Sequence, residues 1–254
     1  MKAKALLFFL LIGLSSVVQA QESTITISGR VTDYEGNPID SSTVRLIHAN
    51  FSDAYITYTD ADGRYSLEGV EKGSYAALYI LRPEEYPRSN AVPKEDMRLE
   101  FWAWNVIADR DLTIDARYHK LELYGTTVFK QIGGYPSMFV YFRPMSVTRY
   151  ISYEELFLDK AKMEANNVDL SVKPEFMDVE VYADDQPLTI YSVQAIEEYI
   201  GETGRQLGYL VQTSLPKRNP DRDRDYIIFR VVGTNREYDE KGENVYFYEL
   251  KDYK

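Results

Sequence analysis

The sequence of 254 residues contains no cysteine. This absence excludes disulfide bonds and thiolate metal sites. It also excludes the lipid anchor that is attached to a cysteine directly after a signal cleavage point, because Gln21 stands there. Beyond the leader, the sequence lacks an apolar run of the roughly 20 residues that one membrane crossing needs, so we predict no membrane span.

The first 20 residues have a composition of their own. Lys2 and Lys4 form a short basic start, residues 5–18 are nearly all apolar, and small residues follow at the two positions that a signal peptidase reads. The pattern predicts a secretory signal peptide over residues 1–20, with cleavage after Ala20. We therefore expect an exported protein, either periplasmic or associated with the outer membrane and cell surface.

Basic residues are outnumbered, with 29 Lys and Arg against 40 Asp and Glu, and the formal net charge is -11. Loss of Lys2 and Lys4 with the signal would take this charge from -11 to -13. Such a surface repels phosphate backbones, so the sequence predicts no nucleic-acid partner. The nearest basic segment, residues 217–225, carries aspartates between its cationic residues and is locally close to neutral.

The first half alternates apolar and polar residues in short segments, the pattern of half-buried strands. Glycine, proline and aspartate punctuate these segments at residues 33–38 and 60–63, as turns require. Short strands with regular turn signals predict an all-β sandwich. Residues 82–98, with three prolines, are predicted to form a long loop. Residues 99–107 then resume strand character, and either close this sandwich or lie between two domains.

Several motifs of the first half follow one another in a fixed order. They are Gly29-x-Val31-x-Asp33-x-x-Gly36-x-Pro38-Ile39, then Val44, then Thr59-Asp60-x-x-Gly63-x-Tyr65-x-Leu67, then Gly73-x-Tyr75. Over about residues 23–81, with a last strand at 112–116, this order resembles the carboxypeptidase regulatory-like domain. Ser42 departs from the family, which usually has alanine there.

This resemblance implies a transthyretin-like β-sandwich without catalytic residues. In the family, the module accompanies peptidases, outer-membrane nutrient transporters and surface proteins of Gram-negative bacteria. It is also classed with carbohydrate-binding-like folds, which is a label for shape, and function must be argued from a site.

The sequence predicts an all-β protein with two β-sandwich domains, at residues 22–117 and 118–254. The second is expected to be an antiparallel sandwich with one or two helical insertions, and it resembles no named family. Its candidate strands are 120–129, 138–147, 168–173, 178–183, 188–193, 207–215, 226–232 and 244–250. Helices are predicted from Ser152, which has the form of a capping box, to about Asn166, and over residues 192–200.

One histidine has the spacing of a zinc ligand. His119-x-x-Glu122 matches the first two ligands of metallocarboxypeptidases, but a third ligand is needed. The only other histidine, His48, lies upstream. Positions three apart on a strand also point to opposite faces. The sequence therefore predicts no metal site.

Two groups of aspartates have spacings that calcium loops share. Asp60-x-Asp62-Gly63 is predicted to form a tight turn, because the residues after it alternate like a strand. The aspartates of residues 221–225 alternate with arginines and are predicted to form a solvated loop with paired charges. Convergence of these carboxylates on a hard cation is the alternative.

No nucleophile elbow and no glycine-rich phosphate loop occurs in the sequence. Gly133-Gly134 precedes Tyr135-Pro136 and is predicted to form a hairpin turn. The sequence thus predicts no catalytic residues and no cofactor. Carboxylates that converge only in the folded protein stay open as an alternative.

Aromatic side chains are the candidate binding residues. Trp102 and Trp104 are the only tryptophans, and side chains two apart on a strand share one face. Exposed, they would form a platform for a sugar or a protein. Buried, they would fill a core or a domain interface, which is favoured because tryptophan is mostly buried. Tyr135 and Tyr141 are weaker candidates.

The leading hypothesis is a non-catalytic, exported accessory protein of the cell envelope that binds a glycan or a protein. A structural or assembly partner of an outer-membrane complex is the first alternative, and predicts an apolar patch or an unprotected edge strand. A hydrolase is the second, and a cleft with converging carboxylates of raised pKa would favour it.

Overall fold

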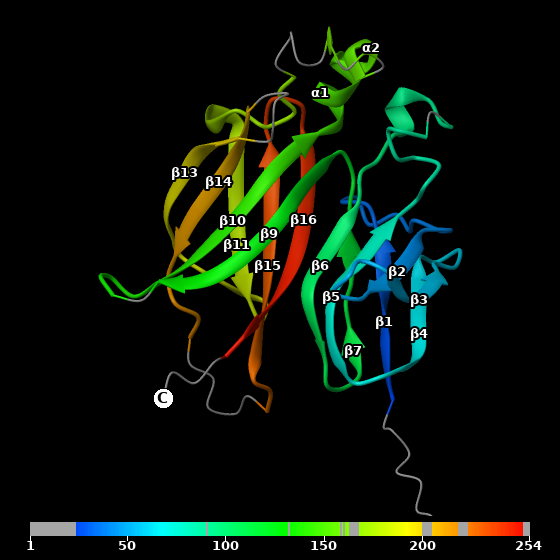
Figure 1. Ribbon diagram of the computed structural model, residues 1–254, viewed down its shortest axis with the longest axis vertical. Helices are drawn as coiled ribbons and strands as arrows, with labels where there is room; N and C mark the ends of the chain where they lie inside the picture. The colour runs from blue at the N-terminus through cyan, green and yellow to red at the C-terminus, as the bar shows by residue number, and fades with distance from the viewer. Residues whose placement is uncertain are drawn as a thin grey trace, which may run out of the picture.

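The computed structural model describes residues 24–89, 91–131, 133–157, 159, 161–162, 168–199, 205–217 and 223–250. The described chain is mostly β, as the sequence predicted (Figure 1). The predicted signal peptide lies outside the described residues.

The first half forms a β-sandwich of short strands. They are β1 (Ile25–Thr32), β2 (Thr43–Ile47), β3 (Asp53–Tyr58), β4 (Arg64–Val70), β5 (Gly73–Leu81), β6 (Phe101–Ala108), β7 (Leu112–Thr113) and β8 (Ala116–Arg117). β1 lies between β4 and the short strands β7 and β8, both of which run parallel to it. The alternation of buried and exposed residues in β1 and β4 gives this small sheet one apolar face, which packs on the sheet that contains β2, β5 and β6.

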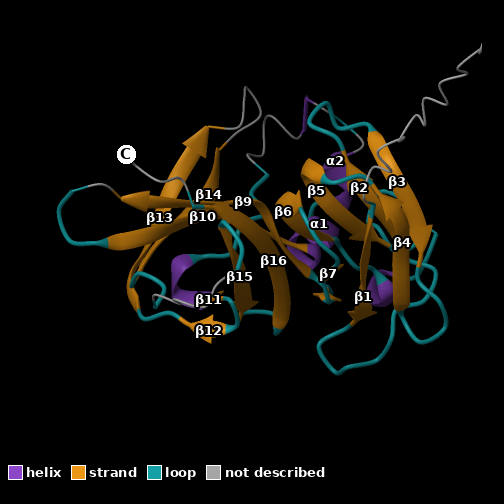
Figure 2. Cartoon of the chain, turned by 90° about the horizontal axis from the view of Figure 1, so that it is seen from below, coloured by secondary structure: helices purple, strands orange, loops and turns teal. Residues whose placement is uncertain are grey.

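The second half adds longer strands and short helices. The strands are β9 (Leu121–Gln131), β10 (Ser137–Ser146), β11 (Met177–Ala183), β12 (Gln186–Pro187), β13 (Ile190–Tyr199), β14 (Arg205–Thr213), β15 (Tyr226–Asn235) and β16 (Glu240–Glu249). The helices are α1 (Val147–Ser152) and α2 (Glu154–Phe157), with 3-10 turns at Lys94–Asp96 and Pro174–Phe176. A sheet of order β13-β14-β10-β9 packs over β11, β15 and β16 (Figure 2).

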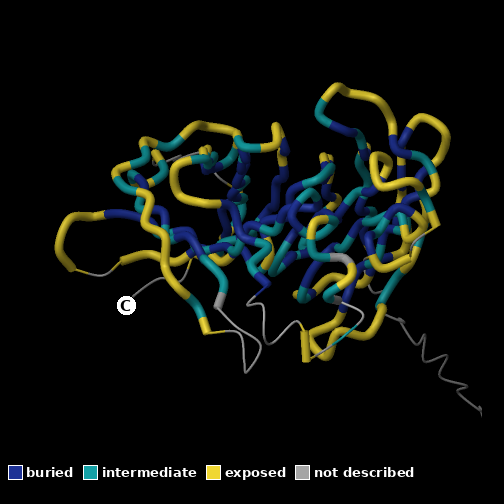
Figure 3. The backbone as a smooth tube through the Cα atoms, turned by 90° about the horizontal axis from the view of Figure 1, so that it is seen from above, coloured by how far each residue is buried: buried dark blue, intermediate teal, exposed yellow. Residues whose placement is uncertain are grey.

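One sheet runs through both halves. Its order is β12-β11-β15-β16-β6-β5-β2-β3, and β16 pairs in parallel with β6, opposing Asn244 to Trp102. The two smaller sheets cover opposite faces of it: Val245 and Phe247 of β16 lie in the first core, whereas Tyr246 and Tyr248 pack against the second. In Figure 3 the buried backbone is accordingly concentrated where the sheets face one another. We call this the shared sheet.

Glycines allow β9 to cross the shared sheet at close range. Gly233 of β15 pairs with Gly242 of β16. A Cβ atom at Gly242 would lie 2.0 Å from the carbonyl oxygen of Leu121, and one at Gly233 would meet the side chains of Leu123 and Met177. No other residue type fits this crossing without a backbone shift.

The side chain of Asn244 ties the two halves together beside the crossing. Its Nδ2 donates to the carbonyl oxygen of Leu123 at 2.5 Å and to Oγ1 of Thr126 at 3.2 Å, and its Oδ1 accepts from the backbone N–H of Trp102 at 3.2 Å. Asn244 is fully buried, so these bonds satisfy groups that water cannot reach.

The predicted helix at residues 192–200 is wrong, because β13 occupies Ile190–Tyr199 and pairs with β14 along that length. Cross-strand pairing overrides a weak local helical preference there. The predicted strand at 168–173 is also wrong: these residues form no strand, although Val168 and Val172 are buried.

The helix expected from Ser152 begins earlier, at Val147. Ser146 caps it, accepting a hydrogen bond at Oγ from the N–H of Arg149 at 3.2 Å. The predicted continuation toward Asn166 lies partly outside the described residues.

The shared sheet joins the two halves of the chain, and the domain boundary expected between residues 117 and 118 stays a prediction.

Ser42 fits the first core in spite of its polarity. Its hydroxyl lies 2.8 Å from the hydroxyl of Tyr118, and its backbone N–H donates to Oγ1 of Thr59. A serine therefore packs where the family usually has alanine.

Gly242→Ala should destabilise the fold by about 3 kcal/mol, at the upper end of the cost of overpacking, because the added Cβ meets backbone. Gly73→Ala is the matched control: a Cβ at Gly73 meets nothing within 4 Å. Urea denaturation measures both variants. Equal unfolding free energies for the two would show that β9 does not cross at Gly242.

Candidate functional site

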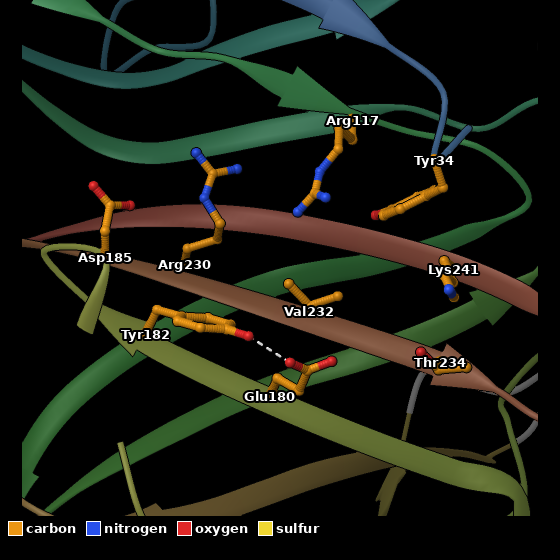
Figure 4. A pocket seen from close by; sticks show the side chains of 9 residues that line it. All are labelled: Tyr34, Arg117, Glu180, Tyr182, Asp185, Arg230, Val232, Thr234 and Lys241. Carbon is orange, nitrogen blue, oxygen red and sulfur yellow. Dashed lines mark hydrogen bonds between the residues drawn. The ribbon is translucent and has the colours of Figure 1, made fainter. Parts of the chain in front are cut away.

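A groove lies on the part of the shared sheet that neither smaller sheet covers. It has a volume of about 410 Å³ (Figure 4). Its lining residues are Tyr34, Arg117, Glu180, Tyr182, Asp185, Arg230, Val232, Thr234 and Lys241. A second hollow of about 340 Å³ shares Arg117 and Arg230 with it. We call the two together the arginine groove.

Strand alternation places the side chains of this groove. Arg230, Val232 and Thr234 are every second residue of β15, and Glu180 and Tyr182 hold the same relation on β11. This is the face of the shared sheet that carries the first core further along, at Val245 and Phe247 of β16. The small sheet of the first sandwich ends at β8, so the polar end of this face stays open.

A buried glutamate fixes both arginines. The side chain of Glu243 is 0% exposed and accepts from Nε of Arg117 at 3.0 Å, from Nη2 of Arg117 at 2.6 Å and from Nη1 of Arg230. Arg230 also donates to the carbonyl oxygen of Asp115 at 3.3 Å. Because Glu243 orients the guanidinium groups, their remaining N–H donors face a possible ligand in a fixed geometry.

Tyr34 brings a hydroxyl into the same groove. The guanidinium carbon of Arg117 lies 5.2 Å from the centre of the Tyr34 ring. The Tyr34 hydroxyl is buried and has no hydrogen-bond partner in the part of the chain that the structure describes. Burial and the charge of Glu243 raise the pKa of Tyr34 well above its usual value, so it stays a neutral donor. In Figure 4 this hydroxyl points toward Arg117.

The arrangement offers donors on one side and acceptors on the other. Lys241 is exposed and adds an ammonium group to the two guanidiniums. Glu180, whose carboxylate accepts from the hydroxyl of Tyr182, lies on β11. A ligand with an anionic group and several hydroxyls would meet both kinds of partner.

The two tryptophans lie elsewhere, on the other face of the shared sheet. Trp102 is 8% exposed, whereas Trp104 is half-buried. Their rings stack at 4.5 Å between centroids, and the ring of Tyr79 stacks on Trp102 at 4.1 Å. Both faces of the Trp102 indole are therefore occupied by neighbouring rings, which leaves neither face for a sugar.

Tyr135 and Tyr141 lie in two further places. Tyr135 is 68% exposed in the β9–β10 hairpin and meets Tyr191 edge to face at 5.5 Å. Tyr141 lies on the outer face of the β13-β14-β10-β9 sheet, over Gly208, and donates its hydroxyl to Glu198. The four predicted aromatic residues therefore form no single site.

The sequence reasoning missed the groove residues. They come from β8, β11, β15, β16, the turn after β1 and the turn between β11 and β12, so no local motif joins them.

A pair of buried glutamates lies beside Trp102. Glu100 accepts from Nε1 of Trp102 at 2.9 Å and from the hydroxyl of Tyr79 at 2.8 Å. Glu122 is 1% exposed, and neither of its carboxyl oxygens has a hydrogen-bond partner among the described residues. Burial, and then the neighbouring charge of Glu100, raise the pKa of Glu122 well above its usual value.

The aspartate turn has the predicted structure. Oδ1 of Asp60 accepts from the backbone N–H of Asp62 at 2.9 Å and of Arg64 at 2.8 Å. Of the other aspartates, Asp221 lies outside the described residues, while Asp223 pairs with Arg110 at 2.7 Å. Among the residues that the structure describes, no three His, Asp or Glu side chains come together as metal ligands do, around His119 or elsewhere.

Comparison with known proteins identifies part of the chain. Residues 26–78 are a carboxypeptidase regulatory-like domain, as the sequence motifs indicated, and no family is assigned to the rest. No curated protein matches the sequence.

Two solved pilin structures align with most of the chain. BcpA, the major pilin subunit of Bacillus cereus, is 12% identical over 89% of this chain and 69% of its own, with a TM-score of 0.27. The major pilin SpaD of Corynebacterium diphtheriae is 9% identical over 89% and 66%, with a TM-score of 0.21. These scores are too low to transfer a function.

No helix among the described residues has the length and apolar character to cross a membrane.

Trp102→Ala should lower the free energy of unfolding by about 3–5 kcal/mol, because it opens a cavity between stacked rings and takes a donor from Glu100. Tyr135→Ala, at an exposed position, should stay within about 0.5 kcal/mol of the parent. Chemical denaturation compares the two. A small effect at Trp102 would return it to the candidates for a binding platform.

Glu122 should make stability depend on pH. Its folded pKa lies above the value of 4.5 for a free side chain, so the folded state holds a proton that the unfolded chain releases. This contribution is fully present below about pH 4.5 and is lost as the pH rises through the folded pKa. Glu122→Gln should flatten that loss and raise stability at pH 8 by on the order of 1 kcal/mol. Urea denaturation at pH 5 and pH 8 measures it, with the exposed Glu84→Gln as control; an unchanged pH profile in Glu122→Gln would contradict the assignment.

Proposed function

We propose that the protein is an exported, non-catalytic binding protein of the bacterial cell envelope whose arginine groove binds an acidic saccharide. One observation carries the proposal: two arginines are held by the buried Glu243 next to a tyrosine hydroxyl that has no partner in the described chain. The groove therefore presents donors that are fixed in place and not fully used.

The guanidinium groups of the groove favour an anionic group. Arg117, Arg230 and Lys241 balance the carboxylates of Glu180, Asp185 and Glu243, so the groove is locally close to neutral on a protein whose net charge is -11. An acidic ligand is therefore repelled less here than by the rest of the protein, and each guanidinium presents a planar fork that matches a carboxylate. The positions of these charged groups select the binding position as well as the ligand.

The remaining lining favours a saccharide over a flat or apolar anion. Glu180, Asp185 and Thr234 provide acceptors and a hydroxyl, and the rings of Tyr34 and Tyr182 provide apolar surface between them. Sugar hydroxyls donate to such carboxylates while their C–H faces lie on aromatic rings. The groove is open and shallow, which suits an extended chain better than an enclosed small molecule.

A role as a structural or assembly partner is the second candidate, and β13 favours it. Among the described residues, this edge strand pairs with β14 on one side and with no strand on the other, and it exposes the side chains of Tyr191, Val193, Ile196 and Tyr199. Lysine and proline, which usually protect such edges, are absent from it, and its charged residues, Glu197 and Glu198, lie near its end. The strand is thus open to pairing with another chain.

The hydrolase alternative has less support. Glu100 and Glu122 do lie side by side with a raised pKa at Glu122, which is one feature of a catalytic pair. However, Glu122 is 1% exposed, and the cavity that it lines measures about 90 Å³. A sugar ring or a peptide bond with its flanking groups does not fit a cavity of that volume.

The groove should bind an oligogalacturonate in isothermal titration and should bind the neutral, carboxyl-reduced oligosaccharide at least tenfold more weakly. Arg230→Gln should weaken binding about 10- to 100-fold, the loss expected for hydrogen bonds to a charged group. Tyr34→Phe and Lys241→Gln test the same groove without exposing the buried Glu243, and should each weaken binding several-fold.

Arg45→Gln is the matched control, because Arg45 is also held by a carboxylate, Asp53, but lies on β2 outside the groove. It should leave binding unchanged. Equal affinity for the acidic and the neutral oligosaccharide, or an equal loss in Arg45→Gln, would refute the proposal.

A further inference from the structure

Glu122 lies at a second cavity, separate from the arginine groove. The cavity is bounded by the loop between β5 and β6, the start of β9, the end of β10, α1 and the segment around Leu170, and measures about 90 Å³. Its lining residues are Tyr86, Pro87, Arg88, Leu99, Glu122, Met145, Ser146, Tyr150 and Leu170. Glu122 and Trp102 lie on the face of the shared sheet that β9 crosses, opposite to the face of the groove.

A carboxylate without a partner is costly at this depth. Both oxygens of Glu122 are buried and accept no hydrogen bond among the described residues. The indole of Trp102 and the hydroxyl of Tyr79 donate to Glu100, and the carboxyl group of Glu100 lies within hydrogen-bonding reach of Glu122, so Glu122 is satisfied there only while it carries a proton. Two adjacent carboxylates in a place that excludes water require a proton or another cation between them.

The lining selects the kind of cation. Calcium takes six to eight oxygen ligands, and this cavity offers few besides the carboxylate of Glu122. Instead, the rings of Tyr86 and Tyr150 and the apolar side chains of Leu99 and Met145 form most of its wall. Aromatic faces together with a carboxylate are the surroundings in which organic ammonium ions bind.

We propose that this cavity binds a primary ammonium group on an unbranched alkyl chain, as at the end of a lysine side chain or in a free alkylamine. The ammonium group would pair with Glu122, and its first methylenes would lie between the aromatic rings. A cavity of about 150 Å³ holds benzene, so one of about 90 Å³ accommodates a smaller group, such as an ammonium with its first methylenes. We call it the ammonium pocket.

The charged groups around the ammonium pocket act in opposite directions. Glu100 adds a second negative charge behind Glu122, which attracts the ligand. Arg143 on β10 is near enough to act on Glu122, but it also pairs with Glu198 at 3.4 Å. Arg88 is exposed and lines the cavity, where its charge opposes an incoming cation.

Binding should exchange a proton for the ammonium group. In the empty pocket the proton on Glu122 relieves the repulsion from Glu100, and an ammonium group takes over that role when it arrives. The affinity should therefore rise with pH until Glu122 is ionised in the free protein. The proton released on binding makes the observed heat depend on the ionisation enthalpy of the buffer.

Titration of the purified protein with n-butylammonium, in HEPES and in phosphate buffer, neither of which contains a primary amine, tests this proposal. We expect saturable binding with buffer-dependent heats, a loss of at least tenfold in affinity in Glu122→Gln, and a gain of several-fold in Arg88→Gln. Glu84→Gln removes an exposed carboxylate from the same loop and should leave the affinity unchanged. Because Glu122→Gln keeps the shape of the side chain and should not destabilise the fold, the variant separates binding from folding.

A peptide with one central lysine distinguishes the source of the ligand. Binding of the free amine identifies a small molecule, and Glu122-dependent binding of the peptide alone identifies a lysine of a partner protein; both outcomes support the ammonium pocket. Equal binding of butylammonium to the parent and to Glu122→Gln would overturn it. So would Glu122-dependent binding of calcium without any binding of either amine. Loss of stability in Arg88→Gln without a gain in affinity would show instead that Arg88 itself serves as the cation.

Discussion

The parallel pairing of β6 with β16 is the constraint on which the rest of the structure depends. It places the last described strand of the chain in the middle of a sheet that begins in the first sandwich, so neither half completes its core alone. Asn244 secures the junction, since its side chain bonds to backbone groups of both Trp102 and Leu123. Loss of this contact would leave two buried backbone groups unpaired, which costs more than the bonds contribute.

The same pairing creates both candidate sites. The two small sheets cover opposite faces of the shared sheet at opposite ends, so each face has an open part beside a covered one. The arginine groove occupies one open part and the ammonium pocket forms at the corner on the other side. Both contain a buried glutamate: Glu243 is neutralised by two arginines, whereas Glu122 has only another carboxyl beside it. The first arrangement fixes cationic groups for an anion, and the second leaves a requirement for a cation.

The strands of the first half could be predicted because their information is local. Alternation sets which face of β1 and β4 is buried, and glycine and aspartate set the turns, as Asp60 illustrates. The sites could not be predicted in this way. Arg117 and Glu243 lie 126 residues apart, and their contact depends on which strands pair rather than on any spacing in the sequence. The prediction of a helix at residues 192–200 was wrong for the same reason. This segment forms β13 because it pairs with β14, and that pairing cannot be read from the segment alone.

The sequence did contain a sign of the junction between the halves. β6 reads Phe-Trp-Ala-Trp-Asn-Val-Ile-Ala, with apolar residues at consecutive positions instead of alternate ones. A strand of this kind is buried on both faces and belongs in the middle of a sheet, with a partner on each edge. β5 supplies one partner, so a second had to come from elsewhere in the chain. β16, with Val245 and Phe247 on one face and Tyr246 and Tyr248 on the other, has the matching pattern. β6 and β16 both carry apolar side chains on two faces, and these side chains are buried when the two strands pair in the middle of the sheet. Each strand then contributes side chains to both cores.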